Sequence, residues 1–378
     1  MRNPESKQTV QAQRLAEQAR HLYLLSGSPI VNRPNDLAPL ISMLTRKNIT
    51  PGEFDQQFLG TKTVSPGILG RLRGVPSVDI PAPKNTGKLK SMLAGHVDYH
   101  APASPDVTKN EERIAVPMSP QQERLHQGFW GQLPWLLRWK LKKDYPLTNE
   151  EMKNLSSFLS GPRQVGLSTL PFMKGKADPY KAYQQSPKLQ MAHQKLQEML
   201  KDQQSKAVVF SNFIRAGLDP YAAALQKDNV PYGMFHGGLG DVQRKQVVDD
   251  YNTGKSRVML LGPAGGEGIS LKGTRLMQLL DPHWNETRNH QAIGRGIRFD
   301  SHSDLPEDQR NVKVQRFVSQ LPEGRLHRLL TSLWQRKPDT ERSRPGVDTY
   351  LERLAGRKEK LNDEFRAILQ EVGTPQAA

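Results

Sequence analysis

The sequence RVMLLGPAGGEGISLKGTRLMQLLDPHWNETRNHQAIGRGIR occupies residues 257–298. It contains two apolar runs, at 257–262 and 275–281, which have the length and composition of buried strands. Glycines follow the first run, and a polar segment that leads into a helical pattern follows the second. Strand, loop, strand, loop and helix in this order predict part of a parallel α/β sheet, in which ligands bind at the carboxyl ends of the strands.

The same alternation continues on both sides of this stretch. Further strands are expected at 206–211, 230–236 and 312–318, and further helices at 186–202, 215–227 and 240–252. Repeated alternation at this spacing predicts a complete doubly wound domain over 188–320. The remaining residues, 321–378, are expected to form a helical C-terminal extension, with helical periodicity over 347–372.

The first half of the chain has weaker patterns. We expect helices at 7–20, 35–44 and 133–143 and a buried strand within 21–30. Proline, glycine and lysine are frequent between about 60 and 118, which is typical of linkers and irregular structure. The expected division is therefore 1–60, which ends with a strand-helix unit, and 61–187, an irregular and helical insertion.

Composition limits the classes of partner and chemistry. The 378 residues carry a formal net charge of +16, which favours nucleic acid and, second, an acidic membrane surface; a solvated basic surface is the plainer alternative. The absence of cysteine excludes disulfides, thiol catalysis and cysteine-ligated zinc. No apolar run is long enough to span a membrane, so no membrane span is expected. With nucleic acid the first candidate among polyanions, no membrane partner is predicted. His96 and His100 have a spacing typical of metal ligands, but no other ligand accompanies them, so they are expected to lie in a loop and no metal site is predicted.

Polar or glycine-rich residues follow each predicted strand. Ser211 and Asn212 follow the first, His236 and Gly237 the second, and the glycine loop 262–271 the third. Glycine lets backbone N–H groups approach an anion closely, and arginine forks match phosphate oxygens. Arg295 and Arg298, three residues apart, therefore predict a phosphate-binding site at this edge, although an internal ion-pair cluster and an ordinary glycine turn remain alternatives.

These motifs together resemble the second motor domain of superfamily 2 helicases and translocases. VVFSNF is similar to motif IV, AGGEGISL to motif V, and QAIGRGIR to the QxxGRxxR form of motif VI, while DPHWN resembles the Swi/Snf-type branch. IRFDSHSDLPEDQRNVKVQRFV resembles viral relatives typified by the poxvirus early transcription factor small subunit and nucleoside triphosphatase I. LLSGSPIVNRPNDLAPLISML resembles motif III, the end of a first motor domain. The resemblance covers 15–60 and 188–372 and implies a RecA-like parallel sheet beside a partial first lobe.

The resemblance implies roles for particular residues. Arg295 and Arg298 would be arginine fingers, and Gln291 would orient water or phosphate beside them. The nucleotide junction would include Gly266, Glu267, Gly268 and Ser270. Nucleic acid, expected to be double-stranded DNA, would contact Ser211, Asn212, His236, Gly237 and Arg244, although Arg244 on a helix face could equally be solvated. Hydrolysis would be coupled to movement by Ser26, Gly27 and Ser28, for which a plain turn is the alternative.

The family's phosphate loop, GxxxxGK[ST], and its DExx pair have no counterpart in these residues. Gly254-Lys255-Ser256 has Asp249 where the first glycine belongs, and Asp363-Glu364 lies in a charged helical pattern. The resemblance thus implies that ATP and Mg²⁺ are shared with a first lobe supplied by a partner or a missing region. We expect no ATP hydrolysis by the chain alone; a split gene, an incomplete gene and a non-catalytic nucleic-acid-binding or interaction module all fit. The expected location is the cytoplasm of a prokaryotic cell or of a phage- or virus-infected cell, with the virion as an alternative.

Overall fold

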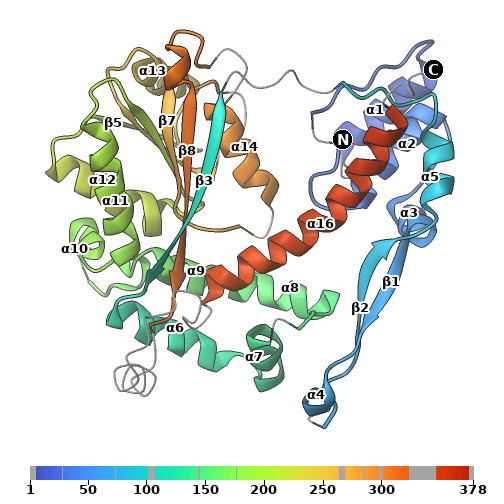
Figure 1. The fold of residues 1–378 in the computed structure, drawn as a ribbon, viewed down its shortest axis with the longest axis horizontal. Helices are drawn as coiled ribbons and strands as arrows, with labels where there is room; N and C mark the ends of the chain where they lie inside the picture. Colours follow the sequence, from blue (N-terminus) through green and yellow to red (C-terminus); the bar gives the residue numbers. More distant parts are fainter. Residues whose placement is uncertain are drawn as a thin grey trace.

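A computed structural model describes residues 6–27, 29–72, 74–100, 107–143, 145–175, 177–263, 269–283, 286–297, 301–322 and 346–373. Its largest unit is a six-stranded sheet in the order β3-β8-β7-β4-β6-β5, in which every pair is parallel (Figure 1). The strands are β3 (Thr108–Pro117), β4 (Lys206–Phe210), β5 (Tyr232–Phe235), β6 (Val258–Leu261), β7 (Thr274–Leu279) and β8 (Asn311–Gln320). The predicted parallel sheet is confirmed.

Helices cover both faces of this sheet. They are α11 (Pro187–Leu200), η3 (Ile214–Leu218, a π turn), α12 (Asp219–Lys227), α13 (Asp241–Asn252), α14 (Glu286–Gly296) and the short η5 (Glu307–Gln309). One core joins Leu189, Leu196 and Leu225 with the sheet side chains of that face, and the other joins Met259, Met277 and Ala292. Alternate residues of each central strand enter opposite cores, which explains why these strands are continuous apolar runs.

Strand β3 was not predicted. It pairs with β8 over ten residues, from Thr108 opposite Asn311 to Pro117 opposite Gln320. β3 lies at the edge of the sheet, and most of its side chains are exposed. Three of its charged residues form ion pairs with neighbouring elements: Glu111 with Arg316, Glu112 with Lys313 and Arg113 with Glu352. The range 61–187, expected to be irregular and helical, therefore contributes a strand to the sheet.

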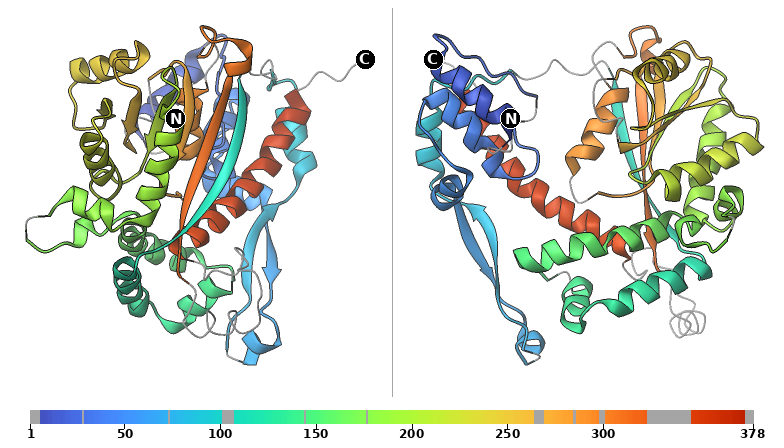
Figure 2. Two further views of the ribbon diagram at one scale, coloured as in Figure 1. Left: turned by 60° about the vertical axis from the view of Figure 1, so that its left-hand side comes forward. Right: turned by 180° about the vertical axis from the view of Figure 1, so that it is seen from behind.

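The N-terminal residues form a separate helical cluster around the C-terminal half of the long helix α16 (Figures 1 and 2). Its elements are α1 (Lys7–Gln18), η1 (Pro34–Leu37), α2 (Ala38–Thr45), α3 (Pro51–Phe58), α5 (Thr86–Leu93) and α16 (Val347–Gly373). Phe54 and Phe58 pack with Phe365 and Ile368 of α16 in one core. α16 therefore supplies apolar surface that the short N-terminal helices need.

The buried strand predicted within 21–30 is wrong. The described residues of this segment have no strand hydrogen bonding, and the side chains of Tyr23 and Leu25 are 84% and 96% exposed. An apolar run becomes a strand only when an adjacent strand pairs with its backbone, and none lies beside this run in the described part of the chain.

A hairpin projects from the N-terminal cluster (Figures 1 and 2). Its antiparallel strands β1 (Leu59–Val64) and β2 (Val78–Pro83) are joined through the short helix α4 (Ile68–Leu72). Because residues 59–83 lie in the proline- and glycine-rich range, the sequence did not reveal this hairpin.

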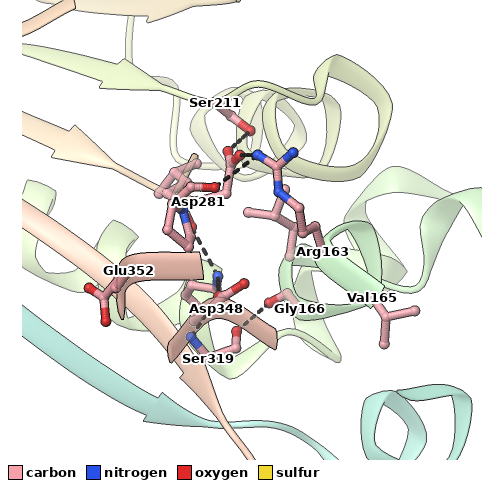
Figure 3. A network of polar contacts seen from close by, with 12 residues as sticks. Arg163, Val165, Gly166, Ser211, Asp281, Ser319, Asp348 and Glu352 are labelled. Atoms are coloured by element: carbon pink, nitrogen blue, oxygen red, sulfur yellow. Dashed lines mark hydrogen bonds and ion pairs between the residues drawn. The ribbon is translucent and has the colours of Figure 1, made fainter. Parts of the chain in front are cut away.

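Short helices connect the cluster with the sheet. They are α6 (Pro120–Gln132), α7 (Trp135–Lys142), α8 (Asn149–Phe158), α9 (Ser160–Leu167), η2 (Leu170–Phe172) and α10 (Pro179–Gln184). The N-terminal end of α16 is fixed to α11 and to β8 of the sheet through Asp348, which is 1% exposed. Its Oδ2 accepts from Lys188 Nζ at 2.8 Å and from the backbone N–H of Ser319 at 2.8 Å (Figure 3). One helix therefore joins the sheet to the N-terminal cluster.

Candidate nucleotide and nucleic-acid site

Four neighbouring parallel strands, β5, β6, β4 and β7, end at the same edge of the sheet. The residues predicted to bind ligands follow these ends, because the chain leaves each strand there and turns toward a helix. Ser211 and Asn212 follow β4, His236 and Gly237 follow β5, and Asp281 follows β7. The structure thus brings the loops of three separate sequence motifs to one edge.

Asp281 joins two of these loops. Its Oδ1 accepts from Ser211 Oγ at 2.7 Å and from the backbone N–H of Asn212 at 2.9 Å, while Asn212 Nδ2 donates to Oδ2 at 2.9 Å. Arg163 Nη2, 3.0 Å from Oδ2, completes the group (Figure 3). The Arg163 side chain is 4% exposed and that of Asp281 0%, so the pair is shielded from water.

Arg163 belongs to α9, far from the motifs. It also donates to the carbonyl oxygen of Pro282 at 2.8 Å, and its guanidinium lies 4.8 Å from the ring centroid of Phe213. α9 therefore holds the loops that follow β4 and β7 in place. Sequence reasoning missed this positioning role: Asp281 was visible as the start of DPHWN, but nothing distinguished Arg163 from other basic residues in 61–187.

Ser211 is fully buried, and its hydroxyl is engaged by Asp281. In this arrangement it shapes the loop, and contact with nucleic acid would fall to Asn212, which is half-buried. The roles given to Ser211 and Asn212 by resemblance stay predictions.

The loop after β5 is held by its own residues. His236 Nδ1 accepts from the Gly238 N–H at 3.1 Å, and Arg244 Nη2 donates to the Gly237 carbonyl at 2.9 Å. Arg244 Nη1 also lies 3.6 Å from Asp241, which is exposed. Such a surface contact contributes little energy, so Arg244 can exchange it for a phosphate.

Burial raises the pKa of Asp219, the first residue of α12, while the charges of nearby His236 and Arg215 act in the opposite direction. Asp219, His236 and Arg215 are therefore close enough to interact electrostatically beside the loop after β5.

Helix α14 carries two of the predicted catalytic residues. Gln291 and Arg295 are four apart, so they lie on one face of the helix, and both are half-buried. The Arg295 carbonyl accepts from the Leu271 N–H at 3.2 Å, which links α14 to the segment after the glycine loop. A Cβ at Gly296 would lie 3.1 Å from Met277 Sδ and 3.4 Å from Thr274, so this glycine lets α14 approach β7 closely.

The other predicted residues are placed as follows. Ser270 is exposed, and its carbonyl accepts from Asn252 Nδ2 at 3.1 Å. Ser26 and Gly27 are exposed in the connection between α1 and η1, away from the sheet edge in sequence and in fold. The residues outside the described ranges are Ser28, Gly266, Glu267, Gly268 and Arg298.

Metal and membrane features were sought across the described ranges. Within them, no group of three or more histidine, aspartate or glutamate side chains is arranged to hold a metal ion. No helix in the same ranges is long and apolar enough to cross a membrane. Gln291 and Arg295 are hydrogen-bond donors, which suit phosphate oxygens rather than a cation.

Residues 190–300 match the family described as the helicase conserved C-terminal domain. The chain carries a helicase C-terminal domain. The match ends two residues after Arg298, so it includes all three predicted motifs of this half, and the parallel sheet with helices on both faces is the expected RecA-like fold. The motifs predicted a resemblance to the C-terminal half of a helicase, and the family match confirms it.

Relatives of the helicase C-terminal domain include viral proteins. A protein of Acanthamoeba polyphaga mimivirus, provisionally named ATP-dependent RNA helicase L538, is 27% identical over 93% of this chain and 70% of its own length. Nucleoside triphosphatase I of Amsacta moorei entomopoxvirus is 45% identical over 69 residues, which are 18% of this chain and 11% of that protein. The chain therefore spans only part of each relative.

Among solved structures, the Sulfolobus solfataricus SWI2/SNF2 ATPase core in complex with double-stranded DNA matches all of this chain and 71% of its own. The sequence identity is 17% and the TM-score is 0.44.

Proposed function

We propose that the chain supplies the second-lobe half of a helicase or translocase ATP site, together with part of the track that holds nucleic acid. The observation that supports this most directly is the arrangement of the motif elements: α14 starts from the sheet edge where the loops after β4 and β5 lie, and it carries Gln291 and Arg295 on one face. Arg295 lies in the last turn of α14, beside the segment that leads into β7. The domain division predicted from sequence, 1–60, 61–187, 188–320 and 321–378, belongs to the same proposal.

Arg295 and Arg298 would contact phosphate oxygens across the cleft between two lobes, with Gln291 beside them. Bound ATP would supply the phosphoryl group whose hydrolysis powers movement. The charge on that group rises in the transition state, and a permanently charged arginine stabilises it there. Mg²⁺ would be held by the other lobe, which carries GxxxxGK[ST] and DExx.

The proposed nucleic acid is double-stranded DNA. The net charge of +16 favours any polyanion, and the known double-stranded DNA complex concerns the SWI2/SNF2 core rather than this chain. The mimivirus relative is named for RNA, so an RNA duplex is the necessary comparison in every binding experiment.

The first prediction concerns salt. Because the candidate contacts are made to phosphates and not to base edges, the observed affinity for duplex DNA should fall steeply with salt. The slope of log affinity against log salt should be about 0.9 per phosphate contact. Fluorescence anisotropy with a labelled duplex of two unrelated sequences, at several salt concentrations, measures it. An affinity that does not change with salt would contradict the proposal, and a strong difference between the two sequences would show base recognition instead.

A non-catalytic nucleic-acid-binding module would give the same salt dependence. The two functions differ in their effect on ATP turnover by a first lobe, because only the enzyme half would stimulate it. A neighbouring reading frame with the GxxxxGK[ST] and DExx motifs would favour the enzyme.

A further inference from the structure

The tip of the β1–β2 hairpin exposes two large apolar side chains. Ile68 is 81% exposed and Leu72 79%. They are four residues apart in α4, so they lie on one face of a single helical turn. An isolated exposed apolar residue is common on protein surfaces, but a pair on one face at the end of a projecting hairpin is not.

The tip is firmly anchored although it is exposed. Just behind it, Val75 and Val78 are buried with Tyr145, and Trp139 of α7 packs against this group. The Tyr145 hydroxyl lies 2.8 Å from the Val64 carbonyl oxygen and 2.9 Å from that of Pro76, within hydrogen-bond distance of both sides of the hairpin. α7 thereby fixes the direction in which the tip points, and a fixed apolar tip can act as a wedge.

Charge identifies the occupant of this tip. Residues 59–84 contain four basic residues, Lys62, Arg71, Arg73 and Lys84, and a single acid, Asp79. The Asp79 carboxylate already accepts from Thr63 Oγ1 at 2.6 Å, whereas Arg71 is exposed within α4 and Lys62 is exposed on β1, which leads to the tip. Exposed Lys143 and Trp135, which is 58% exposed, continue the same character on α7. Nucleic acid, a polyanion whose bases have apolar faces, matches this surface. A second copy of this chain would match it less well, because each copy carries a net charge of +16.

We infer that the hairpin tip is a nucleic-acid wedge. Ile68 and Leu72 insert against the bases at a junction where a duplex opens, and Lys62 and Arg71 contact the flanking phosphates. Apolar side chains placed between base steps unstack them, and basic neighbours offset the cost through the backbone. The wedge rests on the proposed function in one respect, since both require binding to nucleic acid. The hairpin otherwise stands apart, because it lies outside the helicase C-terminal domain and shares no residue with the candidate site.

The test uses the full chain and a forked DNA duplex that carries 2-aminopurine at the junction. Binding of the unsubstituted chain should raise the fluorescence of the probe, since an unstacked 2-aminopurine is brighter. The double variant Ile68→Ser with Leu72→Ser should abolish the rise and weaken fork binding by about tenfold, the loss expected when apolar contacts of this size are removed. Both side chains are exposed, so thermal unfolding should stay unchanged.

The matched control is Leu15→Ser, which removes an apolar side chain that is 68% exposed on α1. It should behave as the unsubstituted chain does. Arg71→Ala should lower the salt slope of fork binding by about 0.9, the value for one phosphate contact on duplex DNA. An undiminished fluorescence rise in the double variant would overturn the wedge.

Two other occupants are distinguished by parallel measurements. Loss of binding to phosphatidylserine vesicles by the double variant, with fork binding intact, would assign the tip to a lipid surface. A change in sedimentation alone would assign it to self-association. In either case the wedge is wrong, but the proposed function survives if salt-dependent duplex binding persists.

Discussion

Arg295→Ala should lower the DNA-stimulated ATP turnover of the chain and a first lobe together by about 10³- to 10⁵-fold, the range measured for arginine fingers acting in trans. The side chain lies on the face of α14 that also carries Gln291, and in the proposed enzyme this face would meet the first lobe. Its charge contributes most when the phosphoryl charge is greatest, so turnover should fall far more than ATP affinity.

Two variants act as controls for this loss. Arg295→Lys should fail nearly as completely, because a lysine is a point charge and lacks the planar fork that reaches two oxygens. Arg124→Ala removes an exposed arginine from α6 and should leave turnover unchanged. Duplex binding should survive Arg295→Ala, because the proposed nucleic-acid contacts belong to other loops. An equal loss of turnover in the Arg124 and Arg295 variants would mean that net charge, not position, matters.

Asp348→Ala should lower the free energy of unfolding by about 3–5 kcal/mol, the cost of leaving a buried charge without its partner. Lys188 is 2% exposed, and its Nζ would keep only the Leu280 carbonyl at 3.0 Å. The Ser319 N–H would lose its acceptor as well. Since Asp348 fixes the start of α16, the N-terminal cluster should also become more sensitive to proteases.

The same helix offers the control. Glu371→Ala removes an ion pair with Lys90 whose side chains are 65% and 35% exposed, and such pairs contribute about 0–1 kcal/mol. The double variant Lys188→Met with Asp348→Leu removes both buried charges and should recover most of the stability. Urea unfolding curves of the four proteins measure these effects. An Asp348 variant no less stable than the Glu371 variant would show that α16 is not held by this pair.

The sequence predicts the central sheet well and its edge poorly. β4, KAVVF, is buried on both faces, so its composition is apolar throughout. β3, TKNEERIAVP, is stabilised by pairing with β8 and by ion pairs. Because it is rich in charged residues and is not an apolar run, the sequence did not predict this strand. The prediction for 21–30 was wrong for the opposite reason. This run is apolar, so its composition predicted a strand, but no described strand pairs with its backbone.

The candidate site shows the same limit. Motif spacing located α14 and the loops after β4 and β5, because each motif is local in sequence. The contacts that position those loops are not local: Arg163 and Asp281 are 118 residues apart, and Lys188 and Asp348 are 160 apart. No periodicity links such pairs, and each residue alone is an ordinary charged side chain. Their roles follow only from burial and distance.

The most direct test of the helicase-half proposal is phosphate release from ATP, measured for the purified chain alone, for a first lobe with the GxxxxGK[ST] and DExx motifs alone, and for their mixture, each with and without duplex DNA. The proposal predicts background rates for the two separate proteins and a DNA-dependent rise in the mixture. A mixture that stays at background would favour the non-catalytic binding module. Robust hydrolysis by the chain alone, lost in Arg295→Ala, would contradict the account, since it would require a complete nucleotide site within these residues.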